Sequence, residues 1–201
     1  MIAIVHYGVG NVGAIANIYK KLGIEAALAT SAAELRAAEQ IILPGVGAFD
    51  WAMGRLNGSG MRDALEREVR EEGKPVLGIC VGMQMLARSS DEGRLAGLGW
   101  IDGEVKRFAV ESAVQLPHMG WNDLQVRAGD GLFRDLESDA RFYFLHSYYF
   151  RAASDEQVLA VTDYNGSFAS SVRNGNVYGV QFHPEKSHQW GIKLLRNFAE
   201  V

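Results

Sequence analysis

Apolar and polar residues follow two different periods along the first half of the chain. Short apolar runs, which are typical of buried strands, lie at residues 2–7, 25–30, 40–45 and 75–79. Segments with apolar residues at helical spacing lie between and after them, at residues 14–23, 31–39, 61–73 and 81–90. Strands that alternate with helices of this length predict parallel βαβ units whose sheet is buried on both faces.

Residues at the helix ends support these boundaries. Gly23 and Gly73 close two of the helical segments, and glycine is favoured where a helix ends. Ser31 and Glu34 have the spacing of a capping box, in which two side chains satisfy free backbone N–H groups of the first turn. We therefore expect helices to begin or end at these residues.

The pattern changes in the second half, where residues 157–164 and 167–182 predict antiparallel strands. Asn174–Gly175 is a strong signal for a tight hairpin. Residues 191–200 predict a closing helix. The chain shows no internal repeat and no linker rich in proline, glycine or serine. We expect a single α/β domain over residues 1–201, with a mixed, mostly parallel sheet flanked by helices.

Composition and charge narrow the classes of partner. The 201 residues are 48% hydrophobic and 22% charged, which is ordinary for a globular protein with a real core. The net charge of −4 argues against nucleic acid as a partner. The apolar N-terminus runs for only five residues before His6, too short for a signal peptide, and no stretch suits a membrane helix. One cysteine cannot form an internal disulfide, so the fold does not depend on an oxidising compartment. Together these features lead us to expect a cytoplasmic protein without a membrane partner.

That cysteine lies at a corner between a predicted strand and a predicted helix, in the sequence Gly78-Ile79-Cys80-Val81-Gly82. This is the sequence form of a nucleophile elbow, a turn that lifts a side chain off the sheet. The helix that follows directs backbone N–H groups and the positive end of its dipole at the sulfur, which favours the reactive thiolate. The alternative is a small apolar core residue, because free cysteines are usually buried.

A thiolate nucleophile needs a proton carrier, and His183 and Glu185 are the candidates. They lie two residues apart at the end of a predicted strand, so both side chains point to the same face. A carboxylate beside an imidazole fixes its tautomer and supports its positive charge. A surface His–Glu pair remains the alternative. We expect no metal site, because the thiol is distant in sequence and no short-spaced ligand cluster occurs.

The segments GICVGMQML (78–86) and GVQFHPEKS (179–187) resemble the triad-type class I glutamine amidotransferases. Cys80, His183 and Glu185 occupy the positions of the family's catalytic triad. The further motifs YGVGN, LPGVGAF, LPHMGWN and YFLHSYY are similar to those of family members that supply ammonia for histidine biosynthesis. The resemblance covers nearly the whole chain and implies a flavodoxin-like fold and no cofactor. His6 departs from the family, in which an acidic residue is common, but it lies outside the triad.

The resemblance also implies the roles of individual residues. Cys80 would attack the side-chain carboxamide of glutamine, and His183, oriented by Glu185, would carry the proton. Backbone N–H groups of the oxyanion hole would come from Val46, Gly47 and Val81. The residues that would bind glutamine are Gly45, Gln84, Glu92, His146, Ser147 and Tyr148.

Members of this family dock on a (β/α)8-barrel synthase subunit as a heterodimer, and ammonia passes through the barrel. That synthase makes imidazole glycerol phosphate and AICAR. The residues that match the docking face are Asn11, Trp121, Tyr143 and Lys186. Aromatic residues are enriched at interfaces, but burial at the edge of the core explains this pair equally well.

A dinucleotide-binding protein is the first alternative, because Gly8, Gly10 and Gly13 match the G-x-G-x-x-G fingerprint after a strand and before a helix. The acidic residue that should close the second strand is missing, since that strand ends near Thr30 and Glu25 lies at its start. The fingerprint is incomplete, and a short loop explains it as well.

Three further alternatives stay open. A different cysteine hydrolase, such as a peptidase, could use the same elbow, although the residues after Cys80 favour an amidotransferase. The glutaminase subunit of another synthase, such as that of pyridoxal phosphate, is a closer relative, and the motifs LPHMGWN and YFLHSYY argue against it. A binding or redox-sensing protein without catalysis is the third, and the intact triad argues against it.

Overall fold

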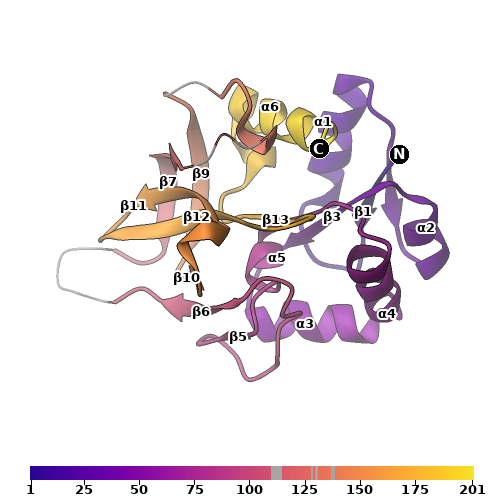
Figure 1. Ribbon diagram of the computed structural model, residues 1–201, viewed down its shortest axis with the longest axis horizontal. Coiled ribbons are helices and arrows are strands. Elements are labelled where there is room, and N and C mark those ends of the chain that lie inside the picture. Colours follow the sequence, from indigo (N-terminus) through magenta and orange to yellow (C-terminus); the bar gives the residue numbers. More distant parts are fainter. Residues whose placement is uncertain (110–114, 128, 130, 137–138) are drawn as a thin grey trace.

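The computed structural model describes residues 1–109, 115–127, 129, 131–136 and 139–201, and Figure 1 shows its arrangement. The α-helices are α1 (Val12–Leu22), α2 (Ala32–Ala37), α3 (Phe49–Gly58), α4 (Arg62–Glu66), α5 (Val81–Gln84) and α6 (His188–Phe198). The strands are β1 (Ile2–Val5), β2 (Ala26–Ala29), β3 (Gln40–Gly45), β4 (Val76–Cys80), β5 (Ser89–Ser90), β6 (Gly103–Arg107), β7 (His118–Asp123), β8 (Gln125–Val126), β9 (Arg141–His146), β10 (Tyr148–Ala152), β11 (Val158–Asp163), β12 (Ser167–Asn174) and β13 (Val177–Val180). The short helices are η1 (Arg67–Glu71), η2 (Gly131–Phe133), η3 (Asp155–Gln157) and η4 (Pro184–Lys186).

The main sheet has two halves. Strands β2, β1, β3, β4 and β13 are parallel neighbours in that order, as the buried apolar runs predict. Beyond β13 the order continues with β12, β10, β6 and β5. The pairs β13–β12, β12–β10 and β10–β6 are antiparallel. Strand β4 ends at Cys80, and β13 ends shortly before His183 and Glu185. The three residues predicted to form the triad therefore lie at the carboxyl edge of the parallel strands.

Helices cover both faces of the parallel strands. Figure 1 shows α1 and α6 on one side and α3, α4 and α5 on the other. Large side chains from both layers are fully buried against the sheet, among them Tyr19, Phe49 and Phe198. This two-faced burial explains why β1, β3 and β4 are almost continuously apolar rather than alternating. The mixed, mostly parallel fold class predicted from the sequence is confirmed.

Several local predictions agree closely with the structure. Strand β3 has the predicted bounds, and α1 is closed by Gly23 at a φ of 69°. Ser31 and Glu34 form the predicted capping box at the start of α2. The hairpin between β12 and β13 exists, but its two turn residues are Gly175 and Asn176, one position later than expected, because Asn174 still pairs with Val177.

Other predictions were wrong. The segment 81–90 was expected to be one helix, but α5 ends at Gln84 and the chain then leaves to form β5 beside β6. The segment 61–73 is helical, but α4 passes into the π-helical turn η1 before it stops at Gly73. Helix α3 and strands β6, β7, β9 and β10 were not predicted at all. Tertiary pairing decides these segments, and local periodicity does not reveal it.

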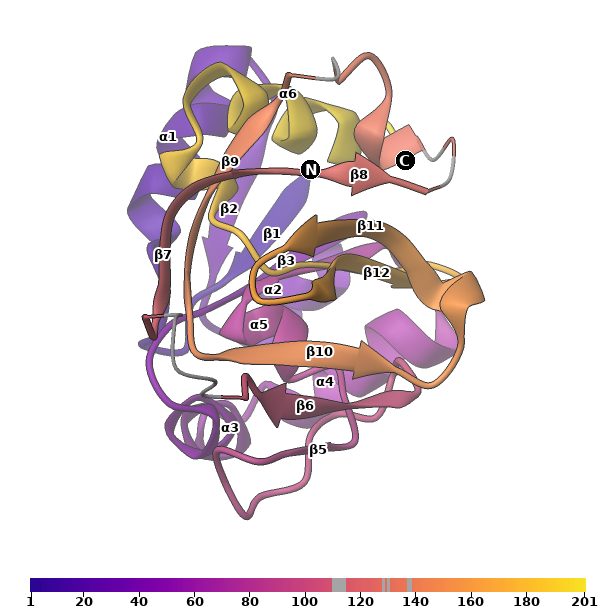
Figure 2. The ribbon, with the colours of Figure 1, turned by 90° about the vertical axis from the view of Figure 1, so that its left-hand side faces the viewer.

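Strands β7 and β9 form a two-stranded antiparallel ribbon separate from the main sheet. Figure 2 shows the two strands running side by side at one flank of the molecule. The outward positions of β7 include Met119 and Trp121, whereas His118 is buried. The ribbon therefore presents apolar side chains to solvent on one face and packs on the core with the other.

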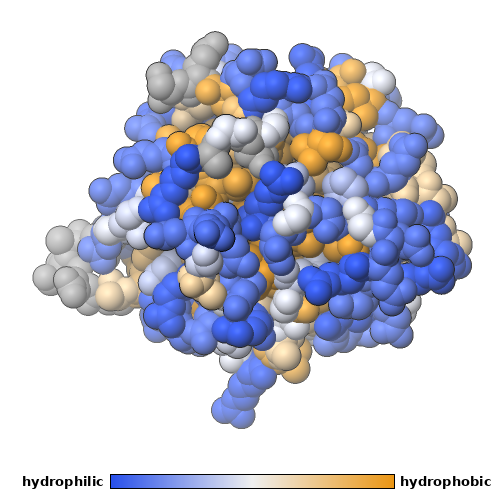
Figure 3. All heavy atoms as spheres, viewed as in Figure 1, coloured by the Kyte–Doolittle hydropathy of each residue, from blue (hydrophilic) through white to orange (hydrophobic). Residues whose placement is uncertain are grey.

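The remaining surface is mixed. The face in Figure 3 carries mostly hydrophilic side chains, with smaller hydrophobic patches between them. None of the helices in the described ranges has the length and apolar character that crossing a lipid bilayer requires.

Candidate active site

The backbone at Cys80 has the conformation of a nucleophile elbow. Cys80 is the last residue of β4 and the residue before α5, and it has a φ of 55° and a ψ of −112°. Such angles are strained for a residue with a side chain, and they are found where surrounding packing holds them. A Cβ atom on Gly82 would collide with the Leu43 carbonyl oxygen, and one on Gly78 would lie 2.6 Å from the Gly82 carbonyl oxygen. Glycines on both sides let α5 pack directly on β3 and β4.

The turn after β3 lies beside the elbow. Gly45 pairs with Cys80 in the parallel ladder, and a Cβ atom on Gly45 would collide with the Gly82 backbone nitrogen. Gly45 therefore allows close packing against the elbow and does not line the cavity. Val46 and Gly47 follow it and do line the cavity, and Gly47 has a φ of 83°. The proposed oxyanion-hole residues Val46, Gly47 and Val81 thus surround one side of Cys80.

His183 follows β13, the parallel neighbour of β4, which brings its ring to the sulfur. Its Nδ1 lies 2.9 Å from Glu185 Oε1, and both side chains are almost fully buried. Burial lowers the pKa of His183, but hydrogen bonds to Cys80 and Glu185 and their charges outweigh it and raise the pKa well above its ordinary value. A positively charged ring beside the sulfur stabilises the thiolate, the nucleophilic form of cysteine.

Strand β9 holds this imidazole in place through the backbone. The His183 N–H group donates to the Tyr143 carbonyl oxygen at 2.8 Å. Ser187 accepts from the Tyr143 N–H group at 3.0 Å and donates to the His183 carbonyl oxygen at 2.6 Å. The β7–β9 ribbon is therefore joined directly to the segment that carries the proton carrier.

A cavity of about 450 Å³ opens in front of Cys80, a volume within the range of small-molecule sites. Its lining residues are Val46, Gly47, Cys80, Val81, Gln84, Glu92, Pro117, Leu145, His146, Ser147, Tyr148, His183 and Lys186. Most site residues predicted from the sequence are in this set. Glu185 is absent because it lies behind His183, and Gly45 is absent for the reason given above.

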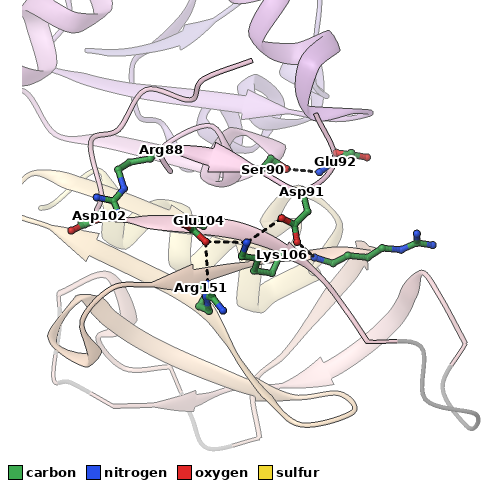
Figure 4. A network of polar contacts seen from close by, with 9 residues as sticks. Arg88, Ser90, Asp91, Glu92, Asp102, Glu104, Lys106 and Arg151 are labelled. Carbon is green, nitrogen blue, oxygen red and sulfur yellow. Dashed lines mark hydrogen bonds and ion pairs between the residues drawn. The ribbon is translucent and has the colours of Figure 1, made fainter. Parts of the chain in front are cut away.

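Glu92 is brought to the cavity by a loop tied at several points. Its Oε2 accepts the Phe49 N–H group at 2.9 Å, at the start of α3, and its own N–H group donates to Ser90 Oγ at 3.1 Å. Figure 4 shows Glu92 beside a network in which Lys106 bridges Asp91 and Glu104. Asp50 accepts from the Arg94 and Leu95 N–H groups on the far side of the loop.

Two buried glutamine side chains lie at the cavity, Gln84 in its lining and Gln181 behind it. Gln84 Nε2 donates to the Tyr148 carbonyl oxygen at 3.0 Å and to Gln181 Oε1 at 3.1 Å. Gln181 Nε2 in turn lies 3.8 Å from Cys80 Sγ. Sequence reasoning missed Gln181. The signal was present, because Gln181 precedes His183 by two residues, as His183 precedes Glu185.

His146 was predicted as a glutamine-binding residue, and it reaches the cavity wall as part of a buried pair. His118 Nδ1 and His146 Nε2 lie 2.9 Å apart, and His146 Nδ1 lies 2.8 Å from the Tyr148 carbonyl oxygen. Burial lowers the pKa of His118 to about 4 and the pKa of His146 to about 3. Both rings are therefore neutral near pH 7, and the Tyr148 carbonyl requires His146 to carry its proton on Nδ1.

The predicted docking residues are grouped near the cavity. Trp121 stacks on His188 with ring centres 5.2 Å apart and meets Tyr143 edge-on at 6.1 Å. Lys186 Nζ lies 5.6 Å from the centre of the Tyr143 ring. Asn11 is exposed at the start of α1, a helix that contacts η4. Met119, which was not predicted, is 61% exposed on the same strand as Trp121, which is 38% exposed.

The glycine fingerprint near the N-terminus is a packed turn. Gly8 and Gly10 have φ values of 84° and 93°, and a Cβ atom on Gly10 would lie 2.7 Å from Pro44 Cβ. In a dinucleotide site the second glycine leaves room for a pyrophosphate, whereas here Pro44 fills that side. Glu25 lies at the opposite end of β2, beside the start of β1. His6 lines a separate hollow with Thr30 and Arg55, outside the catalytic cavity.

Among the residues that the structure describes, no group of three or more His, Cys, Asp or Glu side chains is placed to hold a metal ion. The observed constellation is a thiol, an imidazole and a carboxylate in series at the wall of this cavity. Such a series supports nucleophilic acyl transfer, in which the imidazole moves protons and the carboxylate orients it.

Solved structures with the same fold include class I amidotransferases. One titled "Crystal structure of glutamine amidotransferase" has a TM-score of 0.74 and 26% identity and covers 100% of this chain and 98% of that one. "Structure of PurLQS from Thermotoga maritima" has a TM-score of 0.75 and 21% identity, and covers 99% of this chain and 97% of that one. The second shows likeness of fold alone.

Sequence comparisons extend over the whole chain. The model of the family "Glutamine amidotransferase class-I" matches residues 3–201. "Imidazole glycerol phosphate synthase subunit HisH" of Bdellovibrio bacteriovorus is 57% identical, and its counterpart in Leptospira interrogans is 48% identical, each match covering 100% of both chains. The chain therefore belongs to the class I glutamine amidotransferases and, within them, to the HisH subunits of imidazole glycerol phosphate synthase.

Proposed function

We propose that this chain hydrolyses glutamine to glutamate and ammonia and delivers the ammonia to a (β/α)8-barrel synthase subunit in histidine biosynthesis. One observation carries the proposal. The Cys80 thiol, the His183 imidazole and the Glu185 carboxylate are hydrogen-bonded in series at the wall of a cavity large enough for glutamine. We assign nucleophile, proton carrier and orienting group to these residues in that order.

In the first half of the reaction the Cys80 thiolate attacks the side-chain carboxamide carbon of glutamine. The carbonyl π electrons move to oxygen, and backbone N–H groups of Val81 and of the turn at Val46 and Gly47 stabilise the oxyanion. His183 gives its proton to the amide nitrogen, the C–N bond breaks, and ammonia leaves. A thioester between Cys80 and the glutamyl group remains.

In the second half a water molecule takes the place of the ammonia. The neutral His183 ring removes a proton from this water as the oxygen attacks the thioester carbon. The same N–H groups stabilise the second oxyanion, the C–S bond breaks, and glutamate leaves. The Cys80 thiolate and the protonated His183 are restored, with Glu185 holding the ring orientation in both halves.

The rest of the cavity holds the amino-acid end of glutamine. Gln84, Glu92 and the stretch His146, Ser147 and Tyr148 line the cavity together with the oxyanion turn. The Glu92 carboxylate suits the α-ammonium group, and the hydrogen-bonding groups of the stretch suit the α-carboxylate. Glu92 also accepts from the Phe49 N–H group, so substrate binding engages the helix that directly follows the oxyanion turn.

Ammonia released into water is protonated and lost as a nucleophile, which is why a partner is needed. We propose that the chain forms one domain, acts in the cytoplasm and docks as a heterodimer through Asn11, Trp121, Tyr143 and Lys186. Lys186 lines the cavity and Tyr143 and Trp121 adjoin it, so docking there would let ammonia pass directly into the barrel. The synthase then makes imidazole glycerol phosphate and AICAR.

The test is to replace Cys80 by alanine and assay the reconstituted synthase with glutamine and with ammonium salts. The variant should lose glutamine-dependent synthesis and keep ammonium-dependent synthesis, because only the acyl transfer needs the sulfur. Glutamine hydrolysis by the wild-type chain, measured with and without the barrel subunit, is the companion assay. Equal loss with both nitrogen sources would mean that Cys80 is structural, and the proposed role would be wrong.

A further inference from the structure

A continuous chain of side-chain amides runs from a backbone carbonyl to the catalytic sulfur. It begins at the Tyr148 carbonyl oxygen, which accepts from Gln84 Nε2 at 3.0 Å. Gln84 Nε2 also donates to Gln181 Oε1 at 3.1 Å, and Gln181 Nε2 lies 3.8 Å from Cys80 Sγ, within reach of an N–H···S hydrogen bond. The acyl-transfer mechanism makes no use of Gln181.

The first member fixes the direction of the whole chain. A backbone carbonyl can only accept, so Gln84 must turn its nitrogen toward Tyr148. The same nitrogen also donates to Gln181, so Gln181 must accept with its side-chain oxygen. The Gln181 nitrogen is thereby left facing the sulfur. Neither amide can flip without placing two donors or two acceptors against each other.

Burial makes this arrangement both strong and hard to replace. Gln181 is fully buried, and Gln84 and Cys80 are only 2% and 4% exposed. Little water reaches the chain to compete for its N–H groups, and hydrogen bonds in such surroundings are stronger than in water. A donor aimed at sulfur stabilises the thiolate more than the thiol, because the charged acceptor forms the stronger bond.

We propose that Gln181 is a positioning residue that holds the Cys80 sulfur as a thiolate and fixes its direction toward the cavity, through an anchor at Gln84. The inference rests on the proposed role of Cys80 as nucleophile. Gln181 approaches the sulfur from behind the cavity, while His183 shares the cavity wall with it. The sulfur thus receives two donors, one mobile proton carrier and one fixed amide.

The experiment uses Cys80 itself as the reporter, because it is the only thiol in the chain. The rate of alkylation by iodoacetamide, which reacts with the thiolate, is measured against pH for the full-length protein. Gln181→Met removes the donor at nearly equal volume. Gln181→Glu keeps an oxygen for Gln84 but places a second oxygen, and negative charge, against the sulfur.

Both variants should move the alkylation midpoint to higher pH, by about one unit for Gln181→Met and by more for Gln181→Glu. At pH values well below both midpoints this corresponds to alkylation about ten-fold slower for Gln181→Met. Gln84→Leu breaks the chain one residue earlier and should shift the midpoint in the same direction. Circular dichroism and thermal unfolding identify variants that fold.

Ser171→Ala is the matched control. Ser171 is fully buried on the strand that pairs with β13, and its hydroxyl donates to the Gly179 carbonyl oxygen, away from the sulfur. This variant should lose stability without moving the alkylation midpoint. An unchanged midpoint in the folded Gln181 and Gln84 variants would overturn the proposal. That result is independent of glutamine turnover, so it is distinguishable from failure of the glutaminase assignment.

Discussion

At the scale of single residues, the backbone angles of Cys80 decide what its sulfur can do. A φ of 55° turns the side chain off the end of β4 and toward the cavity, where an ordinary strand residue would point into a sheet face. A positive φ costs a residue with a Cβ atom roughly 1–2 kcal/mol. Close packing of Gly78 and Gly82 against neighbouring backbone carbonyls holds the residue in this conformation.

Replacement of Gly82 by alanine tests this packing. The added methyl group would meet the Leu43 carbonyl oxygen, so we expect a loss of about 3 kcal/mol or more in the free energy of unfolding. Gly54→Ala is the matched control, because Gly54 lies within α3 and a Cβ atom there has no neighbour within 4 Å. That control should gain roughly 0.5–1 kcal/mol. Urea unfolding measures both, and equal effects would contradict the packing argument.

The raised pKa of His183 predicts how stability depends on pH. The contribution of the charged ring is complete below about pH 6.5, the pKa of an unfolded histidine, and is lost as pH rises through the higher folded value. Glu185→Gln removes one support of that charge. We expect it to reduce the free energy of unfolding by on the order of 2 kcal/mol near pH 6. The deficit should shrink steadily toward alkaline pH.

Urea unfolding of the wild type and of Glu185→Gln at a series of pH values checks this expectation. Glu104→Gln serves as the control, because Glu104 takes part in exposed ion pairs with Lys106 and Arg151. Exposed pairs contribute little, so this variant should differ from the wild type only slightly at every pH. A deficit for Glu185→Gln that stays constant with pH would show that the charge of His183 plays no part.

At the scale of elements, the loop that carries Glu92 is clamped to α3 from two sides. Glu92 accepts from Phe49, and Asp50 accepts from Arg94 and Leu95. The oxyanion turn lies immediately before this helix. The carboxylate proposed to bind glutamine and the proposed oxyanion turn therefore share one rigid support, although Glu92 lies 45 positions after Gly47 in the chain.

Asp50→Ala tests the clamp. Loss of the carboxylate frees the backbone of the Glu92 loop, so we expect the KM for glutamine to rise about ten-fold while kcat changes less. Asp63→Ala is the control, since Asp63 is also an acidic residue in the first turn of a helix, α4. Glutaminase kinetics with the barrel subunit present measure both variants. A selective fall in kcat with unchanged KM would contradict the clamp.

Sequence reasoning predicted the elements whose pattern is local. The parallel strands, the capping box at Ser31 and the elbow at Cys80 all follow from short-range signals, and the triad order follows from motifs. It failed where partners are distant in sequence. Helix α5 ends at Gln84 because the Leu98 N–H group then donates to the Met85 carbonyl oxygen and β5 pairs with β6. Helix α3 was missed, and it contains Gly54 and Gly58.

The candidate site shows the same division. Residues within motifs could be assigned by resemblance, and the structure places most of them around one cavity. Gln181 was missed because its partners Gln84 and Cys80 lie about a hundred residues earlier, and only the fold brings them within contact. Gly45 was expected to touch glutamine, but the parallel pairing of β3 with β4 turns it against the elbow.

At the scale of the whole molecule, the proposed docking residues on the ribbon are linked to the proposed catalytic residues. Trp121 and Tyr143 stand on the β7–β9 ribbon, and Tyr143 also bonds to the backbone of His183 and to Ser187. A partner bound to the ribbon could therefore shift the backbone of the segment that carries His183, because Tyr143 is hydrogen-bonded to it. Such contact gives a physical route by which partner binding alters glutamine hydrolysis.

Trp121→Ala should weaken binding of the barrel subunit by about 2 kcal/mol, because a large aromatic side chain at an interface is a typical hot spot. Leu28→Ala is the control, since Leu28 is similarly exposed, at 40%, on the edge strand β2. Calorimetric titration of each variant with the barrel subunit gives the affinities. Equal effects of the two substitutions would show that the docking face lies elsewhere.

Two histidines that burial keeps neutral lie opposite each other at one end of the ribbon, His118 on β7 and His146 on β9, and His118 also contacts the main body through Tyr164. The His118 ring stacks on Tyr164 at 3.9 Å and on Phe144 at 4.7 Å, and it contacts His146 through a hydrogen bond. Because the folded pKa values are about 4 and about 3, each ring destabilises the folded state by up to about 1.4 kcal/mol per pH unit below about pH 6.5.

At acidic pH the ribbon should therefore unfold locally before the main sheet unfolds. Hydrogen–deuterium exchange, corrected for intrinsic rates, should show β7 amides losing protection at mildly acidic pH ahead of β3 and β4, and His118→Gln should reduce the difference. Uniform loss of protection across all strands would contradict this. Protein stored in an acidic buffer would therefore keep the fold of its main sheet but bind a partner of the ribbon more weakly.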